Sequence, residues 1–372
     1  MLRTLFRLLA LGGALIILVL LAPLAGAGAK AQPSAALSAK ISILATGLDN
    51  PRGLKFGPDG NLYVAEAGRG GSHSTVGQCK QVPDPIGPYT GGMTARISKI
   101  TRAGVRTTVI DHLPSSQTSA ASGGDVLGVA DVAFLGNTLY ALLAGGGCSH
   151  GVPNIPNGII KVEPGEGEWD LIANLSHFIM THPVKHPSPD DFEPDGTWYS
   201  MVGVADDDLF AVEPNHGELD EIETDGGIKR VIDISASQGH IVPTAVAFHD
   251  GNFYVGNLNT FPIQGGSSKI FKITPNGQIS VFATGLTTVL GITFDNLGRM
   301  YVLENTTGGN PFPTPGTGKV VRLSTSGALT TIVSGLTLPT GMTFGPDGRL
   351  YISTFGFGYP PGMGQIVRVS FS

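Results

Sequence analysis

Short apolar segments separated by tight turns recur along most of this chain. In each copy, a segment ending in Phe leads through a turn into a second segment that opens on an aromatic residue. The clearest copies are residues 56–64 and 344–352, whose turns contain Asp59-Gly60 and Asp347-Gly348. Asp-Gly pairs suit the positive-φ positions of tight hairpins. Less regular copies occupy residues 134–141, 204–212, 248–255 and 294–302. The pattern predicts six β-hairpins.

A second hairpin follows each of the first five copies. These second hairpins occupy residues 99–109, 161–171, 221–232, 272–282 and 322–332. The sixth copy, residues 364–369, stops after a single strand. The missing strand stands at the other end of the chain, because residues 41–48 match residues 279–286 almost position for position.

A displaced strand of this kind indicates a closed ring of sheets. Pairing the N-terminal strand into the last sheet removes the open edges that the first and last sheets would otherwise have. We therefore predict an all-β fold, a six-bladed β-propeller over residues 32–372. The excess length lies in Gly- and Pro-rich loops, which we expect after the second strands on one rim, where binding residues often lie. These loops are residues 67–95, 112–128, 144–158, 176–198 and 305–318.

The N-terminus has the order of a secretory signal peptide. Arg3 and Arg7 precede an apolar run over residues 8–22, and small residues follow at 25–31. This order predicts a signal peptide over residues 1–31, cleaved after Ala31. An uncleaved anchor is the alternative, because residues 8–29 could just span a bilayer. After cleavage we expect no transmembrane span and a secreted protein, located outside the cell, in the periplasm or at the cell envelope.

Composition narrows the class of protein further. The 54 Gly residues suit tight turns, and the 41% of hydrophobic residues can form a core. With 23 basic and 29 acidic residues the formal net charge is −6, which argues against nucleic acid as a partner. In an exported protein Cys79 and Cys148 are expected to form a disulfide. A thiolate metal site is the alternative, but neither cysteine has a closely spaced second cysteine.

We aligned the repeats on the aromatic residue that opens the second strand of each blade. The residue three positions later is then expected at the same level along the strand in every blade. These residues are Glu66, Leu143, Glu213, Asn257, Glu304 and Thr354. If they face a common axis, Glu66, Glu213, Asn257 and Glu304 offer oxygen ligands of the kind that calcium prefers. Alternatively, the acids are solvated or pair with nearby Arg and Lys residues. Glu213 and His216 are candidates for a catalytic base and its partner.

The first blade also resembles a known family. Residues 50–71, Cys79 and residues 94–100 together look like the ScyD/ScyE family of exported propellers, and the resemblance covers residues 41–372. More distantly, the repeats are similar to NHL-repeat, gluconolactonase-type and strictosidine-synthase-type propellers. The resemblance implies the fold and export. The gluconolactonase-type metal ligands are matched only loosely, by Glu66 and Asn257.

Two functions follow as hypotheses. The first is an exported binding or accessory module whose rim loops hold a small molecule, a glycan or an envelope protein. The second is a calcium-dependent propeller hydrolase, acting on lactones or esters, or a condensing enzyme. An aromatic patch on the rim would favour binding, and its candidates are Phe312, Phe355, Phe357 and Tyr359. The segment 355–359 could equally pack over the last blade.

Overall fold

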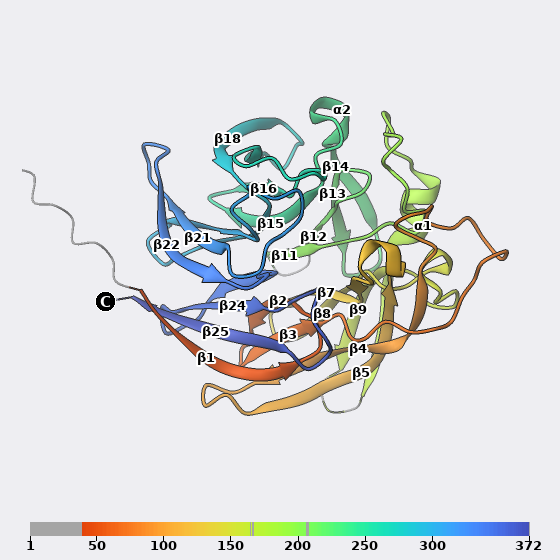
Figure 1. Ribbon diagram of the computed structural model, residues 1–372, viewed down its shortest axis with the longest axis horizontal. Coiled ribbons are helices and arrows are strands. Elements are labelled where there is room, and N and C mark those ends of the chain that lie inside the picture. Colours follow the sequence, from red (N-terminus) through yellow and green to blue (C-terminus); the bar gives the residue numbers. More distant parts are fainter. Residues whose placement is uncertain (1–38, 164, 166, 206–207, 372) are drawn as a thin grey trace, which may run out of the picture. The chain divides into compact units, whose positions relative to one another are not determined.

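Six small antiparallel sheets dominate the computed structural model, which describes residues 39–163, 165, 167–205 and 208–371. The expected signal peptide, residues 1–31, lies outside the described residues. Each sheet is one blade, and in the first five blades the strands follow one another in space as in sequence. The first strand of every blade contacts the first strand of the next, and β23 contacts β2. The sheets therefore form a closed ring, which confirms the six-bladed β-propeller (Figure 1).

The strands of the blades have the following bounds. The first strands are β2 (Pro51–Phe56), β7 (Val129–Leu135), β11 (Ser200–Val204), β15 (Pro243–His249), β19 (Val289–Phe294) and β23 (Gly341–Phe344). The second strands are β3 (Leu62–Glu66), β8 (Thr138–Leu143), β12 (Asp208–Glu213), β16 (Asn252–Asn257), β20 (Met300–Glu304) and β24 (Leu350–Thr354). The third strands are β4 (Thr90–Ile100), β9 (Gly158–Glu163), β13 (Glu218–Glu223), β17 (Ser268–Ile273), β21 (Gly318–Leu323) and β25 (Gly364–Phe371). The fourth strands are β5 (Arg106–Gln117), β10 (Glu168–Asn174), β14 (Ile228–Asp233), β18 (Ile279–Leu286), β22 (Leu329–Leu336) and β1 (Ala39–Leu48).

The N-terminal strand closes the ring as predicted. Strand β1 is the outer strand of the sixth blade and runs antiparallel to β25, with Ile41 opposite Val369 and Ile43 opposite Val367. Figure 1 shows the two ends of the described chain side by side in this blade. The pairing satisfies the outer edge of β25, so the last blade has the same four strands as its neighbours.

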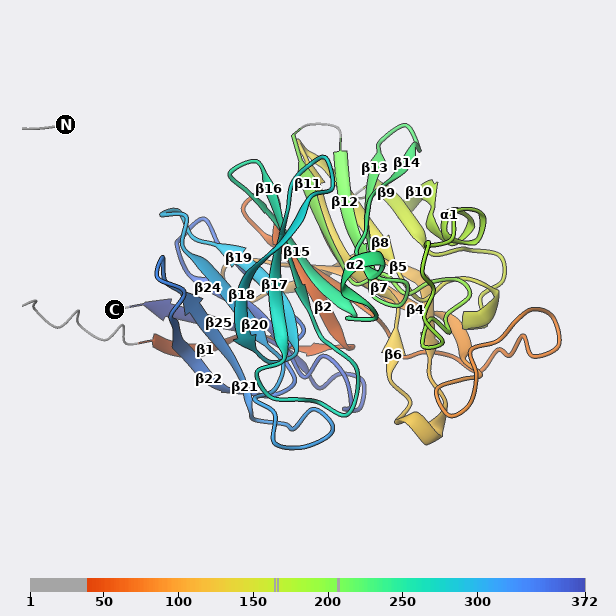
Figure 2. The same ribbon diagram turned by 90° about the horizontal axis from the view of Figure 1, so that it is seen from above.

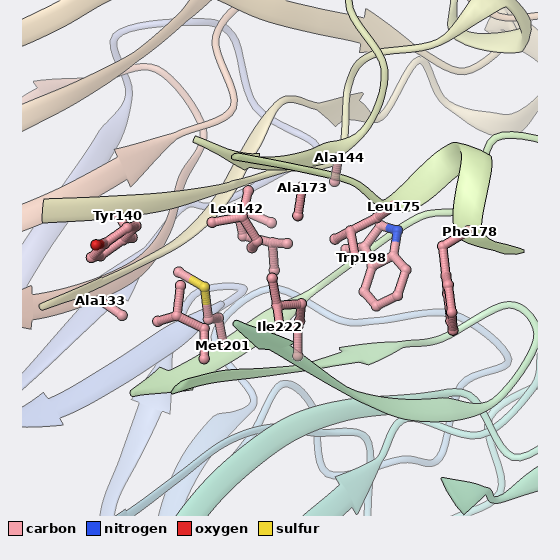
Figure 3. Packing of buried hydrophobic residues seen from close by; sticks show 14 of the residues in the cluster. Ala133, Tyr140, Leu142, Ala144, Ala173, Leu175, Phe178, Trp198, Met201 and Ile222 are labelled. Atoms are coloured by element: carbon pink, nitrogen blue, oxygen red, sulfur yellow. The ribbon is translucent and has the colours of Figure 1, made fainter. Parts of the chain in front are cut away.

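One hydrophobic cluster fills each of the six interfaces between neighbouring blades. The cluster between blades 2 and 3 contains Trp198, Met201, Leu142 and Ile222 (Figure 3). Because neighbouring blades cover both faces of each sheet, the second strands are buried almost along their whole length. This burial explains why those strands read as continuous apolar runs in the sequence.

The long loops gather on one side of the ring. In each blade the connection from the second to the third strand leaves by the same end at which the first strand enters. In Figure 2 these connections lie on the side opposite the tight hairpin turns, as the loops before β17 and β21 show. The expectation of one rim is therefore confirmed. We call this side the loop face.

Two details of the loops differ from the expectation. Parts of residues 67–95 and 112–128 are strand rather than loop, because they extend β4 and β5 into a long hairpin to which β6 (Val126–Leu127) adds a fifth strand. In addition, residues 112–128 and 176–198 follow fourth strands rather than second strands, and the latter include the helix α1 (Leu175–Thr181). A second short helix, α2 (Ser235–Gln238), precedes β15.

The disulfide between Cys79 and Cys148 is present, with an S–S distance of 2.10 Å. It joins the loops that follow the second strands of blades 1 and 2. Within the described part of the chain, no helix has the length and apolar character needed to cross a membrane.

Candidate functional site

The six residues aligned in the sequence occupy equivalent places in the ring. Each is the last residue of the second strand of its blade, and all six are buried. They are Glu66, Leu143, Glu213, Asn257, Glu304 and Thr354. The alignment of the repeats on their aromatic residues therefore identified equivalent positions in all six blades.

The three acidic members bind the backbone that enters the first strand of their own blade. Glu66 Oε2 accepts a hydrogen bond of 2.6 Å from the backbone N–H of Asp49. Glu304 Oε1 accepts one of 2.6 Å from the N–H of Thr287. These N–H groups are buried and precede strand pairing, so a carboxylate that receives them replaces water as their partner.

Basic side chains complete the surroundings of these two carboxylates. Arg106 and Arg96 lie 2.8 and 3.1 Å from the oxygens of Glu66. Lys319 Nζ lies 3.0 Å from Glu304 Oε2. Burial raises the pKa of Glu304, and Lys319 opposes this shift. Glu66 and Glu304 thus pair with nearby Arg and Lys side chains, whereas Glu213 contacts backbone N–H groups and His216.

Asn257 makes the same connection without a charge. Its amide donates to the carbonyl oxygen of Ile241 at 2.9 Å and accepts from the backbone N–H of Lys269 at 2.8 Å. The amide thus joins the entry of the first strand to the start of the third. In blades 1, 4 and 5 the last side chain of the second strand thus binds the backbone that enters the first strand, which indicates a structural clamp that recurs around the ring.

The proposed calcium ligands do not form one group. Among the residues that the structure describes, no three His, Cys, Asp or Glu side chains are arranged to hold a metal ion. Glu66, Glu213 and Glu304 instead direct their oxygens to partners within their own blades. Calcium binding at these positions belongs to the alternative hypothesis of a hydrolase, and it would require these side chains to leave their present partners.

Glu213 and His216 do lie together, as the sequence suggests. Glu213 accepts from the backbone N–H groups of Thr197 and His216, and His216 Nδ1 lies 3.3 Å from Glu213 Oε2. Burial lowers the pKa of His216, but the carboxylates of Glu213, Glu218 and Asp191 together outweigh this and raise the pKa to about 9. The imidazole is therefore protonated at neutral pH, and a protonated imidazole cannot act as a general base.

A cavity on the ring axis is small. Residues from the first strands of all six blades line a space of about 20 Å³, which is room for about one water molecule. Gly53 is required here, because a Cβ at this position would lie 1.9 Å from Asp131 Oδ1. Asp131 is buried and accepts from the backbone N–H groups of Val132 and Met201.

Tyr199 crosses the axis at the loop face. Its hydroxyl donates to the carbonyl oxygen of Thr340 at 3.1 Å, which joins blade 3 to blade 6. Burial raises the pKa of Tyr199 to about 12, while the nearby Arg52 guanidinium acts to lower it. Arg52 itself donates to the carbonyl oxygen of Val126. Tyr199 and Thr340 thus line the axial cavity and join two opposite blades across it.

A buried polar cluster under the loop face was not found by the sequence analysis. Tyr89 donates to Glu193 Oε1 at 2.8 Å, and His150 Nε2 lies 3.7 Å from Glu193 Oε2. Burial raises the pKa of Glu193 to about 7 and lowers that of His150 to about 4. The three residues come from three separate loops, so only the folded structure brings them together. All three are inaccessible to a substrate.

The aromatic candidates divide into two sets. Phe355 and Tyr359 pack edge to face at 4.9 Å and are half-buried, and Phe357 lies beneath the Arg52 guanidinium. Phe312 is 65% exposed and faces Phe261, which is 48% exposed, with their ring centroids 5.7 Å apart. The aromatic side chains of residues 355–359 therefore pack against neighbouring side chains, whereas Phe312 belongs to an exposed patch.

Comparisons with known proteins bear on the fold. No protein-family model and no curated protein matches the sequence. Solved structures do match. A protein of unknown function from Bacteroides thetaiotaomicron has 12% identity and a TM-score of 0.57, over 90% of this chain and 76% of that one. The calcium-binding protein regucalcin from Agrobacterium tumefaciens has 13% identity and a TM-score of 0.56, over 88% and 92%. A gluconolactonase from Xanthomonas campestris has 12% identity and a TM-score of 0.55, over 90% of each chain.

This protein shares its fold with those propellers. Its structural neighbours include propellers of the gluconolactonase and regucalcin type, which agrees with the more distant of the two resemblances noted in the sequence. At identities of 12 to 13% the likeness establishes the architecture, while chemistry has to be argued from this chain's own residues.

Proposed function

We propose that this chain is an exported binding or accessory module of the ScyD/ScyE type, which holds its ligand with the loops of the loop face. The observation that carries this proposal is the contrast between the axis and the rim. The axis is crossed by Tyr199 and encloses about 20 Å³. The rim presents the exposed aromatic side chains of Phe261 and Phe312 in the loops of blades 4 and 5, and a disulfide joins the loops of blades 1 and 2.

Export is part of the proposal. The order of Arg3, Arg7, the apolar run and the small residues before Gln32 supports a cleaved signal peptide. The disulfide fits an oxidising compartment. N-terminal sequencing of the protein recovered from outside the cytoplasm is expected to begin at Gln32. Recovery of the full-length chain in membranes would instead support an uncleaved anchor.

The binding role is tested with the purified mature protein and cell-envelope material from the host that exports it. Replacing residues 308–316 by a Gly-Ser linker is expected to reduce retention on that material at least tenfold. The control replaces residues 296–297, in a hairpin turn on the opposite side of the ring, and is expected to behave as the wild type. Equal retention by both variants and wild type would contradict a role for the rim.

The alternative is a calcium-dependent hydrolase of lactones or esters, or a condensing enzyme. Glu66, Glu213, Asn257 and Glu304 support it only through their equivalent positions, because each is engaged within its own blade. Turnover of a lactone that depends on added calcium, and that is lost in Glu304→Gln, would favour this alternative over the binding module.

A further inference from the structure

Charged residues are unevenly distributed among the loops of the loop face. The loops of blades 1 to 3 carry charged residues, which are Arg69, Lys80, Asp84, Asp125, Lys185, Asp190, Asp191, Glu193 and Asp195. The loops after the second strands of blades 4, 5 and 6 are residues 258–267, 305–317 and 355–363, and they contain no charged residue. Residues 144–157 of blade 2 are also uncharged but mostly buried, whereas most of residues 258–267 and 305–317 are exposed or half-buried.

Contacts between the loops of blades 4 and 5 make these two loops continuous. The backbone N–H of Ile263 donates to the carbonyl oxygen of Pro311 at 2.9 Å. A Cβ on Gly308 would lie 3.0 Å from the Cα of Gly265, so the two backbones touch. Phe261 and Phe312 stand in these two loops and pack against one another, with an angle of 31° between their ring planes. We call Phe261, Phe312 and the two loops the aromatic platform.

The polar groups of the aromatic platform are all neutral. Thr260, Gln264 and Asn310 are exposed beside the two rings. Amides and hydroxyls both donate and accept hydrogen bonds. Aromatic faces take apolar C–H surfaces. A sugar ring presents both features, since one face of a pyranose carries C–H groups and its edge carries hydroxyls.

We propose that the aromatic platform binds a neutral polysaccharide, by stacking of sugar rings on Phe261 and Phe312 and by hydrogen bonds from sugar hydroxyls to the neighbouring amides and hydroxyls. This inference rests on the proposed function, because it names the ligand class of the rim. The lack of charge selects against acidic glycans and anionic lipid headgroups, which require Lys or Arg partners.

Co-sedimentation of the mature protein with microcrystalline cellulose, chitin and insoluble starch tests the inference. Retention on at least one of the three is expected, with a reduction of at least tenfold in Phe312→Ala and in Phe261→Ala. Phe312→Tyr keeps the ring and is expected to keep retention. Leu297→Ala is the matched control, because Leu297 is 69% exposed in a turn on the opposite side of the ring. Retention is expected to be the same in 50 mM and 500 mM salt, since no ion pair is involved.

The results of these experiments distinguish a failure of the polysaccharide inference from a failure of the proposed function. Absence of retention on all three polysaccharides, or equal retention by Phe312→Ala, Phe261→Ala and wild type, would overturn the polysaccharide inference. Binding to phosphatidylcholine vesicles that is lost in Phe312→Ala would overturn it in favour of a lipid surface. If envelope material is still held through residues 308–316 in either case, the proposed function stands; if it is not, both fail.

Discussion

The hydroxyl of Tyr199 and the carbonyl oxygen of Thr340 form a hydrogen bond of 3.1 Å between two blades that face one another across the ring. Tyr199 stands just before β11 in blade 3, and Thr340 stands just before β23 in blade 6. In a six-membered ring these blades are opposite. The bond therefore spans the axis at the loop-face ends of the first strands, beside the axial cavity that both residues line.

Loss of the Tyr199 hydroxyl should weaken the ring. We expect Tyr199→Phe to lower the free energy of unfolding by about 1–2 kcal/mol, because the bond is lost and the Thr340 carbonyl is left without this partner. Urea denaturation measures the effect. Tyr359→Phe removes a hydroxyl from a half-buried tyrosine on the rim and should change stability by less than about 0.5 kcal/mol. An equal effect of the two substitutions would show that the bond across the axis is not formed.

The carboxylate of Glu66 is predicted to be a structural clamp. Glu66→Gln leaves Arg96 and Arg106 without their shared anion, and we expect it to cost about 3 kcal/mol in the free energy of unfolding. Glu168→Gln, at an exposed position in β10, is the control and should be neutral. Full stability of Glu66→Gln, measured by thermal and urea unfolding, would contradict the clamp.

Stability should depend on the protonation of His216. Its pKa is raised to about 9 in the folded protein, so its stabilising effect is complete below about pH 6.5 and is lost as the pH rises through about 9. We expect the wild type to lose about 2–3 kcal/mol more than His216→Gln between pH 6.5 and 9.5. Urea titrations across this range measure the difference. Parallel pH profiles of the two proteins would refute an ionic Glu213–His216 pair, and exposed His177→Gln controls for the substitution itself.

The disulfide should stabilise the loop face. Cys79 and Cys148 are 69 residues apart, and closing a loop of this size stabilises a folded protein by about 4 kcal/mol through the unfolded state. The double substitution of both cysteines by Ser should lower the urea midpoint accordingly. Added reductant should lower the midpoint of the wild type and leave that of the double variant unchanged. A reductant effect on the double variant would assign the loss to another cause.

The fold could be predicted because the propeller repeats its own signals. The Asp-Gly turns at 59–60 and 347–348 set the hairpin register, and the likeness of residues 41–48 to 279–286 identified the strand that closes the ring. A register error of one residue would have moved every side chain to the other face of its sheet. The agreement of all six strand ends with the aligned positions shows that no such error was made.

The role of the aligned residues could not be predicted in the same way. The position of Glu304 follows from local periodicity, but its partners Thr287 and Lys319 are 17 and 15 residues away in sequence and meet it only in the folded blade. No sequence pattern identified the role of Tyr199, because its hydrogen-bond partner is 141 residues away in an opposite blade. Phe261 was missed because its meaning depends on the loop of the next blade.

The central claim is that the buried acids are blade clamps and that ligands bind at the rim. Elemental mass spectrometry of the purified mature protein, followed by calorimetric titration with calcium after chelation, tests it most directly. We predict no metal in stoichiometric amount and no heat of binding, in the wild type and in Glu304→Gln alike. One calcium ion held tightly per chain, and lost in Glu304→Gln or Glu213→Gln, would contradict the account and establish the axis as the functional site.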